Sequence, residues 1–253
     1  MDELSEPVVG GAEETPQPKE REPFWGYDDL GVFLGMGLPL LLASLMFVRL
    51  AEPLGKRIGL GQMASLLVAQ FVWYGLWLTA LKGLLGLRYR RPFWRSLAWV
   101  LPPGGLWLPM LGGPLLAVAT GGLGVLLRAP KVEIAPLEGL LGSPASIVLL
   151  VVGVAVLGPL CEELAFRGFL MPLLIRSLGV VAGIGVTALL FALLHGPEYG
   201  WSWRHVLLIL GAGVAFGLVR WRSRSTLAAA VMHAMYNLTF VSAFLAGGGS
   251  ATK

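Results

Sequence analysis

Three short fragments in the second half of the chain carry the residues that could do chemistry. They span Glu162–Arg167, Phe191–His195 and His233–Asn237. Each lies inside a long apolar run, where ionisable side chains are costly and by default mark a functional site. Together the fragments supply two carboxylates, two imidazoles, a guanidinium and an amide. This set, placed on separate predicted helices, indicates an enzyme with its site at membrane depth.

The two adjacent carboxylates, Glu162 and Glu163, must have different tasks. Successive residues of a helix point about 100° apart, so the two side chains cannot face the same way. Glu163 and Arg167 are four residues apart, in the order that favours an ion pair along a helix. We therefore expect a buried Glu163–Arg167 pair and a free Glu162 that serves as general base. The alternative is an ion-pair cluster that only holds two helices together.

The two histidines complete a set suited to hydrolysis. Phe191 lies one turn before His195, and His233 and Asn237 are also one turn apart, so each pair shares a helix face. Glu162 with a histidine can deprotonate a water, and a second histidine with an asparagine can donate hydrogen bonds to an oxyanion. This chemistry hydrolyses an amide without a covalent intermediate. The same residue types also permit a zinc site of Glu162, His195 and His233, although the metal-free chemistry is favoured.

Composition places the chain in a membrane. Of 253 residues, 56% are hydrophobic and 13% are charged, whereas a soluble domain carries roughly 25% charge. Residues 1–30 hold nine acids and two bases, and the remainder holds 17 bases and six acids. The basic balance therefore belongs to the membrane body and indicates loops facing anionic lipid, not nucleic acid. The single cysteine, Cys161, excludes an intramolecular disulfide and a cysteine zinc cage.

The apolar runs predict an all-α, polytopic transmembrane bundle of seven or eight spans with an intramembrane catalytic cavity. A spanning helix needs about 20 mostly apolar residues. Candidate spans lie at roughly 30–50, 63–86, 97–127, 146–175, 178–195, 204–221 and 225–246. The third is rich in glycine and proline and is predicted to be kinked. The fourth contains Gly158-Pro159 and is predicted to be tilted, broken there or divided in two.

The chain divides into four parts on this pattern. Residues 1–29 are predicted to be a disordered acidic tail, 30–145 the N-terminal helices and a loop, 146–246 the catalytic core, and 247–253 a short C-terminal tail. Strict alternation of the spans puts two basic loops on the same side as the N-terminus, which predicts a cytoplasmic N-terminus. The bases of these loops are Arg88, Arg90, Arg91 and Arg95 in the first and Arg220, Arg222 and Arg224 in the second.

The three fragments resemble the motifs of the CPBP family of intramembrane proteases, also called the CAAX-protease and bacteriocin-processing, or Abi, family. The family pattern is Glu-Glu-x-x-x-Arg, then Phe-x-x-x-His, then His-x-x-x-Asn or Asp. All three motifs are complete and in order here, and the resemblance covers about residues 146–246. It implies a helical bundle with a glutamic-type site open to a cavity inside the membrane.

The resemblance also implies roles for the motif residues. Glu162 and His195 would activate the water, and His233 and Asn237 would stabilise the oxyanion. The Glu163–Arg167 pair would position these groups. The expected substrate is a membrane-associated or lipid-modified protein cut near its C-terminus, and the expected setting is a prokaryotic inner membrane.

Two other functions fit the same residues. A non-catalytic immunity or scaffold protein could retain the constellation, and an ion-coupled transporter could use buried Glu and His as a proton relay. The sequence leaves the substrate, the oligomeric state and the physiological pathway open.

Overall fold

The computed structural model describes residues 22–57, 61–130 and 144–247, and every secondary-structure element in these ranges is a helix. The first half contains α1 (Tyr27–Gly35), α2 (Gly37–Arg57), α3 (Gln62–Tyr89), α4 (Phe93–Ser96) and α5 (Trp107–Leu126). The second half contains α7 (Pro144–Val152), η1 (Gly153–Leu157), α8 (Gly158–Glu163), η2 (Leu164–Leu170), α9 (Met171–Leu178), α10 (Val180–Leu194), η3 (Gly196–Tyr199), α11 (Trp203–Ser223) and α12 (Thr226–Ala246). The predicted all-α class is confirmed.

Six helical runs within these ranges are long and apolar enough to cross a membrane. They are Tyr27–Gly55, Gln62–Tyr89, Trp107–Leu126, Ser146–Leu178, Trp203–Ser223 and Thr226–Ala246. The remaining predicted span, 178–195, corresponds to the shorter apolar helix Val180–Leu194. The protein is thus an integral membrane protein.

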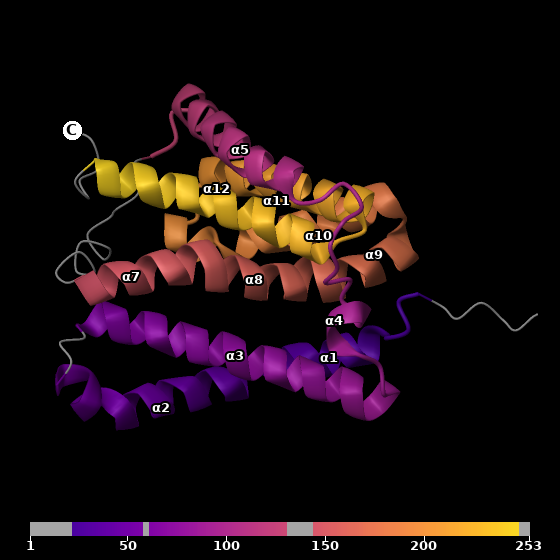
Figure 1. Cartoon of the computed structure of the whole chain (residues 1–253), viewed down its shortest axis with the longest axis horizontal. Coiled ribbons are helices and arrows are strands. Elements are labelled where there is room, and N and C mark those ends of the chain that lie inside the picture. The colour runs from indigo at the N-terminus through magenta and orange to yellow at the C-terminus, as the bar shows by residue number, and fades with distance from the viewer. Residues whose placement is uncertain (1–21, 58–60, 131–143, 248–253) are drawn as a thin grey trace, which may run out of the picture.

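The run that carries the two glutamates lies at the centre of the bundle. Figure 1 shows α7 and α8 lying between α3 on one side and α12 on the other, with α2 packed outside α3. The helices α10 and α11 pack together beyond them, and α5 crosses the outer face of α12. The acidic helix α8 therefore receives side chains from both halves of the chain.

The third predicted run, 97–127, is only partly helical. Its helix, α5, begins at Trp107: Pro102 and Pro103 cannot lie inside a helix that continues from residue 97, and Gly105 has a non-helical φ of 71°. The preceding segment instead binds the start of α12. Thr226 donates its backbone N–H to the Ala98 carbonyl at 2.9 Å and its hydroxyl to the Leu97 carbonyl at 2.6 Å. This segment thereby fixes the end of the helix that bears His233 and Asn237.

The prediction of a disordered tail is wrong for residues 22–29, which are ordered. Residues 1–21 lie outside the described ranges. Trp25 is 2% exposed, stacks on Phe169 and donates its indole N–H to the Phe169 carbonyl at 3.1 Å. The helix α1 follows from Tyr27. The aromatic side chains of this segment join a buried cluster and so outweigh its acidity. The cluster comprises Trp25, Phe33, Leu81, Leu85, Phe93, Leu97, Leu164 and Phe169.

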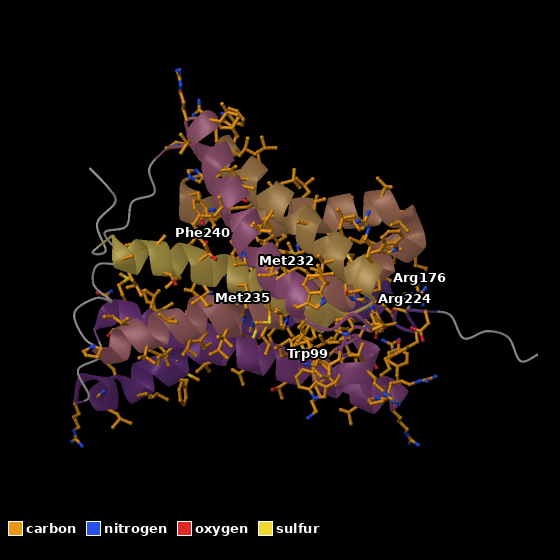
Figure 2. All side chains as sticks on the ribbon, turned by 45° about the horizontal axis from the view of Figure 1, so that its top comes forward. Trp99, Arg176, Arg224, Met232, Met235 and Phe240 are labelled. Atoms are coloured by element: carbon orange, nitrogen blue, oxygen red, sulfur yellow. The ribbon has the colours of Figure 1, made fainter. Side chains whose placement is uncertain are left out.

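The two basic loops do share one end of the molecule with the start of α1. Arg88 bonds the carboxylates of Asp28 and Asp29, at 2.5 and 2.8 Å. The segment after the second loop is bonded to the segment after the first, as Thr226 shows. Figure 2 shows Arg176 and Arg224 at this same end.

Asp29 is the buried centre of this end, with a fully buried side chain. Its carboxylate accepts three hydrogen bonds, from the Gly26 backbone N–H at 2.8 Å, the Arg88 guanidinium at 2.8 Å and the Tyr89 hydroxyl at 2.6 Å. It therefore joins the start of α1 to the end of α3. Asp28 contacts Arg88 at the surface, and its side chain is 63% exposed.

We expect Asp29→Ala to lower the free energy of unfolding by about 3 kcal/mol, because three donors lose a buried, charged acceptor. Asp28→Ala is the matched control and should leave the melting temperature almost unchanged. Thermal unfolding of the purified protein in detergent, followed by tryptophan fluorescence, measures both. Equal melting temperatures for the two variants would contradict this role of Asp29.

Candidate active site

The helical run that carries Glu162 and Glu163 extends without a break from Ser146 to Leu178 and contains two π-helical turns. The α8 segment lies between η1 and η2, so the two glutamates sit between two widened turns. Turns of this kind occur frequently at functional sites. The run is neither broken at Gly158-Pro159 nor divided in two, because Pro159 stands in the first turn of α8, where its missing N–H is tolerated.

The buried centre of the site is the ion pair between Glu163 and Arg167. Arg167 donates from Nη1 to Glu163 Oε1 at 2.8 Å, and both side chains are 0% exposed. A second donor, Arg167 Nη2, bonds the Gly213 carbonyl of α11 at 2.9 Å. The guanidinium carbon lies 4.5 Å from the centroid of the Phe191 ring, in a cation–π contact with α10. The predicted pair is present, and Arg167 also contacts α10 and α11.

His233 is fixed by the same carboxylate. Its Nδ1 lies 3.0 Å from Glu163 Oε1, and its ring stacks on Phe216 with centroids 4.5 Å apart. An ionised carboxylate only accepts hydrogen bonds, so Nδ1 carries the proton. The other ring nitrogen, Nε2, lies 3.9 Å from Glu162 Oε2. This distance is too long for a direct hydrogen bond.

Glu162 is the accessible member of the acidic pair. Its side chain is 17% exposed, whereas that of His233 is 5% exposed and that of Glu163 is fully buried. The sequence predicted that the Glu162 carboxylate would be free. Instead, the Tyr74 hydroxyl donates to its Oε1 at 3.1 Å. Tyr74 belongs to α3 and was missed because a tyrosine in an apolar span resembles any packing aromatic. The available signal was Gln70 one turn earlier, which donates to the Tyr74 hydroxyl at 3.2 Å.

His195 approaches the site beside Phe191. Its Nδ1 lies 2.8 Å from the Phe191 carbonyl, which can only accept, so Nδ1 is again the protonated nitrogen. The Phe191 ring contacts both imidazoles, with centroids 4.5 Å from His195 and 5.7 Å from His233. Phe191 is therefore a shared wall between the two histidines. No hydrogen bond joins His195 to Glu162 in the part of the chain that the structure describes.

Asn237 has a structural partner that the sequence did not predict. Its Nδ2 donates to the Val154 carbonyl at 2.8 Å. This carbonyl has no donor within its own helix. Gly158 donates to Gly153, five residues back, instead of to Val154, and the next residue, Pro159, has no N–H to give. The amide of Asn237 thus donates the hydrogen bond that Pro159 cannot donate to Val154. Its second N–H remains available.

An additional acid follows the second motif. Glu198, on η3, is exposed at the protein surface, yet the protein atoms packed beside it raise its pKa, and the charge of Glu162 adds to this effect. His195 acts in the opposite direction on the same pKa. Burial raises the pKa of the neighbouring Tyr199 to about 12. Sequence reasoning missed Glu198, although its position three residues after His195 was the available signal.

The alternative zinc site would use Glu162, His195 and His233 as ligands. Within residues 22–57, 61–130 and 144–247, no group of three or more His, Cys, Asp or Glu side chains is placed to hold a metal ion. The zinc site of Glu162, His195 and His233 stays a prediction, and two of its members, Glu162 Oε2 and His233 Nε2, lie 3.9 Å apart.

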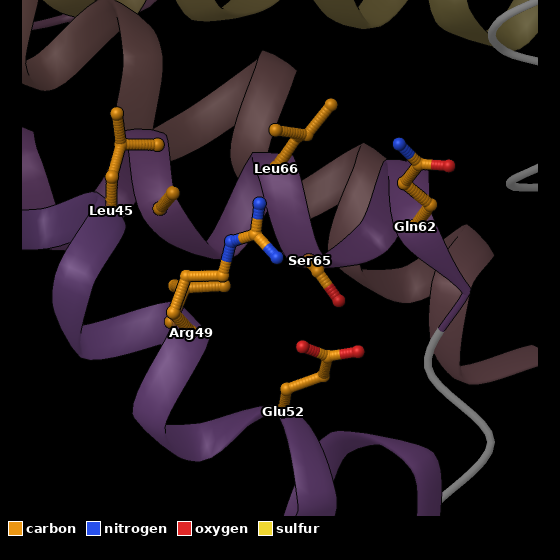
Figure 3. Close-up of a pocket in the computed structure, with 8 residues that line it drawn as sticks. Leu45, Arg49, Glu52, Gln62, Ser65 and Leu66 are labelled. Carbon is orange, nitrogen blue, oxygen red and sulfur yellow. The ribbon is translucent and has the colours of Figure 1, made fainter.

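Two cavities lie apart from the motifs. One of about 460 Å³ opens between α2 and α3, where Figure 3 shows the side chains of Arg49 and Glu52. The other, of about 730 Å³, has mostly apolar walls from the segment before α5, the end of α11 and Met232. Neither contains a residue of the three motifs, although Met232 directly precedes His233.

Comparison with known proteins identifies the segment that contains the motifs. Residues 144–239 match the family model described as type II CAAX prenyl endopeptidase Rce1-like. This segment is similar to an Rce1-like domain. The match includes all three motifs and confirms the resemblance to the CPBP family of intramembrane proteases. No curated protein and no solved structure matches the chain.

The hydrogen bond from Asn237 to the Val154 carbonyl should stabilise the fold, and this can be tested by substitution. We expect Asn237→Ala to lower the free energy of unfolding by about 1 kcal/mol, because a partly buried acceptor loses its donor. In a Pro159→Ala background the penalty should shrink, since the helix regains a backbone N–H. A double-mutant cycle measured by thermal unfolding in detergent separates the two terms. An equal loss of unfolding free energy in both backgrounds would show that Pro159 is not the reason why the Val154 carbonyl lacks a donor in its own helix.

Proposed function

We propose that this protein is an intramembrane endopeptidase that hydrolyses a peptide bond near the C-terminus of a membrane-associated or lipid-modified protein. One observation carries the proposal. A partly exposed carboxylate, Glu162, stands beside a buried cluster of Glu163, Arg167 and His233, inside an Rce1-like domain. A purely structural ion pair would not need the second, accessible carboxylate.

Glu162 acts as the general base in this proposal. Its Oε1 is held by Tyr74, so Oε2 is the oxygen left to bind the water. His195, with its proton on Nδ1, offers the lone pair of Nε2 as a second acceptor for that water. The water gives one proton to Glu162 while its oxygen attacks the carbonyl carbon. When the intermediate collapses, the C–N bond breaks and Glu162 passes the proton to the leaving amine.

His233 and Asn237 stabilise the oxyanion. In this proposal His233, whose ring is fixed by the bond from Nδ1 to Glu163, donates an N–H from Nε2 to the reacting carbonyl oxygen. Asn237 contributes the N–H that is not bonded to Val154. Donors fixed before the reaction are effective because they need no rearrangement as charge develops. The loss of one such donor typically costs about 10²–10³ in rate.

The arrangement of charge supports a cytoplasmic N-terminus. The end of the bundle that contains the start of α1 also contains the basic loops after α3 and α11. Loops rich in arginine are retained on the cytoplasmic side of a membrane. We further propose that this membrane is a prokaryotic inner membrane.

The decisive variant is Glu162→Gln, which keeps the size of the side chain and removes its basicity. We expect specific membrane proteins to retain an uncleaved tail in cells that express this variant, compared with wild type at matched abundance. Quantitative mass spectrometry of the N-terminal and C-terminal peptides of membrane proteins measures this and names the substrate. Asp28→Asn, an exposed isosteric change far from the motifs, is the control and should process like wild type.

If the Glu162→Gln variant, equally abundant, leaves every peptide terminus unchanged, the protein is not a protease that uses Glu162. The scaffold and transporter functions would then take its place. Loss of the protein itself would instead indicate that Glu162 is structural.

The metal-free mechanism makes a separate prediction. Cleavage of the identified substrate by purified protein should persist after treatment with a strong zinc chelator, and elemental analysis should find far less than one zinc per chain. Stoichiometric zinc, with activity lost on its removal and restored on its return, would establish a metalloprotease.

A further inference from the structure

The N-terminal half of the chain contributes to the site through one hydrogen bond. Tyr74 on α3 donates to Glu162 Oε1 across 88 positions of sequence, and it lies outside the segment that matches the protease family. We propose that Tyr74 is a positioning residue that orients the Glu162 carboxylate for its reaction, an inference that rests on the proposed function.

The direction of the bond is fixed by Gln70. A tyrosine hydroxyl has one proton to donate and can accept with its oxygen. The Gln70 amide N–H donates to that oxygen at 3.2 Å, so the single hydroxyl proton points to Glu162. The carboxylate would otherwise rotate broadly about its last torsion angle. With Oε1 engaged, Oε2 is held toward His233, 3.9 Å from Nε2.

The rotation of α3 about its axis is set by its other face. Trp73 donates its indole N–H to the Gly37 carbonyl at 2.9 Å, and Trp77 donates to the Phe33 carbonyl at 2.7 Å. The two indoles stack, with centroids 5.1 Å apart. These anchors bind one face of α3 to α1 and α2. Tyr74, about 100° around the helix from Trp73, is thereby aimed at α8.

The distance between α3 and the catalytic run is set by Gly153. A Cβ at this position would collide with the Phe71 ring of α3, so the glycine permits the close approach of the two helices. This contact lies one turn of α3 from Tyr74. The hydroxyl therefore reaches Glu162 from a helix held in both rotation and distance.

The matched test compares two identical substitutions in the same helix. Tyr74→Phe removes the bond to Glu162, and Tyr89→Phe removes a bond to Asp29 at the far end of α3. With the substrate peptide identified by the Glu162→Gln comparison, we expect Tyr74→Phe to lower kcat about tenfold and leave KM nearly unchanged. Tyr89→Phe should keep the kcat of wild type per folded molecule.

A second background separates positioning from general stability. Glu162→Asp shortens the carboxylate and withdraws it from Tyr74. In that background Tyr74→Phe should lower kcat less than twofold, because the bond is already lost. A residue that only stabilises the fold would lower activity by the same factor in both backgrounds.

The outcomes distinguish the two claims. If Glu162→Gln blocks cleavage but Tyr74→Phe cleaves as fast as Tyr89→Phe, the positioning role is wrong and the protease stands. Equal kcat losses for Tyr74→Phe in the wild-type and Glu162→Asp backgrounds would also overturn it. If Glu162→Gln changes no peptide terminus, the proposed function fails and this inference fails with it.

Discussion

The site depends on a buried charge that has to be neutralised. Glu163 carries a fully buried carboxylate inside an apolar bundle, and an isolated ion there would cost several kcal/mol. Arg167 and His233 share its Oε1, and Arg167 extends to the Gly213 carbonyl and the Phe191 ring. Helices α8, α10, α11 and α12 must therefore meet at one point. The geometry of the accessible groups follows from this requirement.

The second constraint is the proline beside the acidic motif. Pro159 removes a backbone N–H at the place where the helix also widens into a π-helical turn, and the Val154 carbonyl is left without a donor in its own helix. Asn237 supplies that donor from α12. The same side chain is thus held in place by a structural bond and presents its remaining N–H. Fixing a donor in this way favours catalysis, because the orientation does not have to be established during the reaction.

The sequence predicted the parts of the site that depend on local spacing. Glu163 and Arg167 are one turn apart, so their pairing follows from helix geometry alone. The donor from Tyr74 to Glu162 was not predictable, because it joins residues 88 positions apart and requires the packing of α3 on α8. The partner of Asn237 was missed for a different reason. Nothing in the spacing of the motifs reveals which backbone carbonyl lacks a donor.

The errors in the fold also have physical causes. Apolar content alone extended the third span back to residue 97, although the helix begins only at Trp107, after Pro102, Pro103 and a Gly105 with φ of 71°. Acidity alone extended the disordered tail to residue 29, although Trp25 is buried and Asp29 is neutralised by donors on α3. Both errors concern segments whose conformation is decided by contacts with distant residues. The first segment fixes the start of α12, the helix that carries Asn237. The second fixes the end of α3, the helix that carries Tyr74. The three motifs therefore lie within the segment that matches the family, but their alignment depends on the part of the chain that the family match does not include.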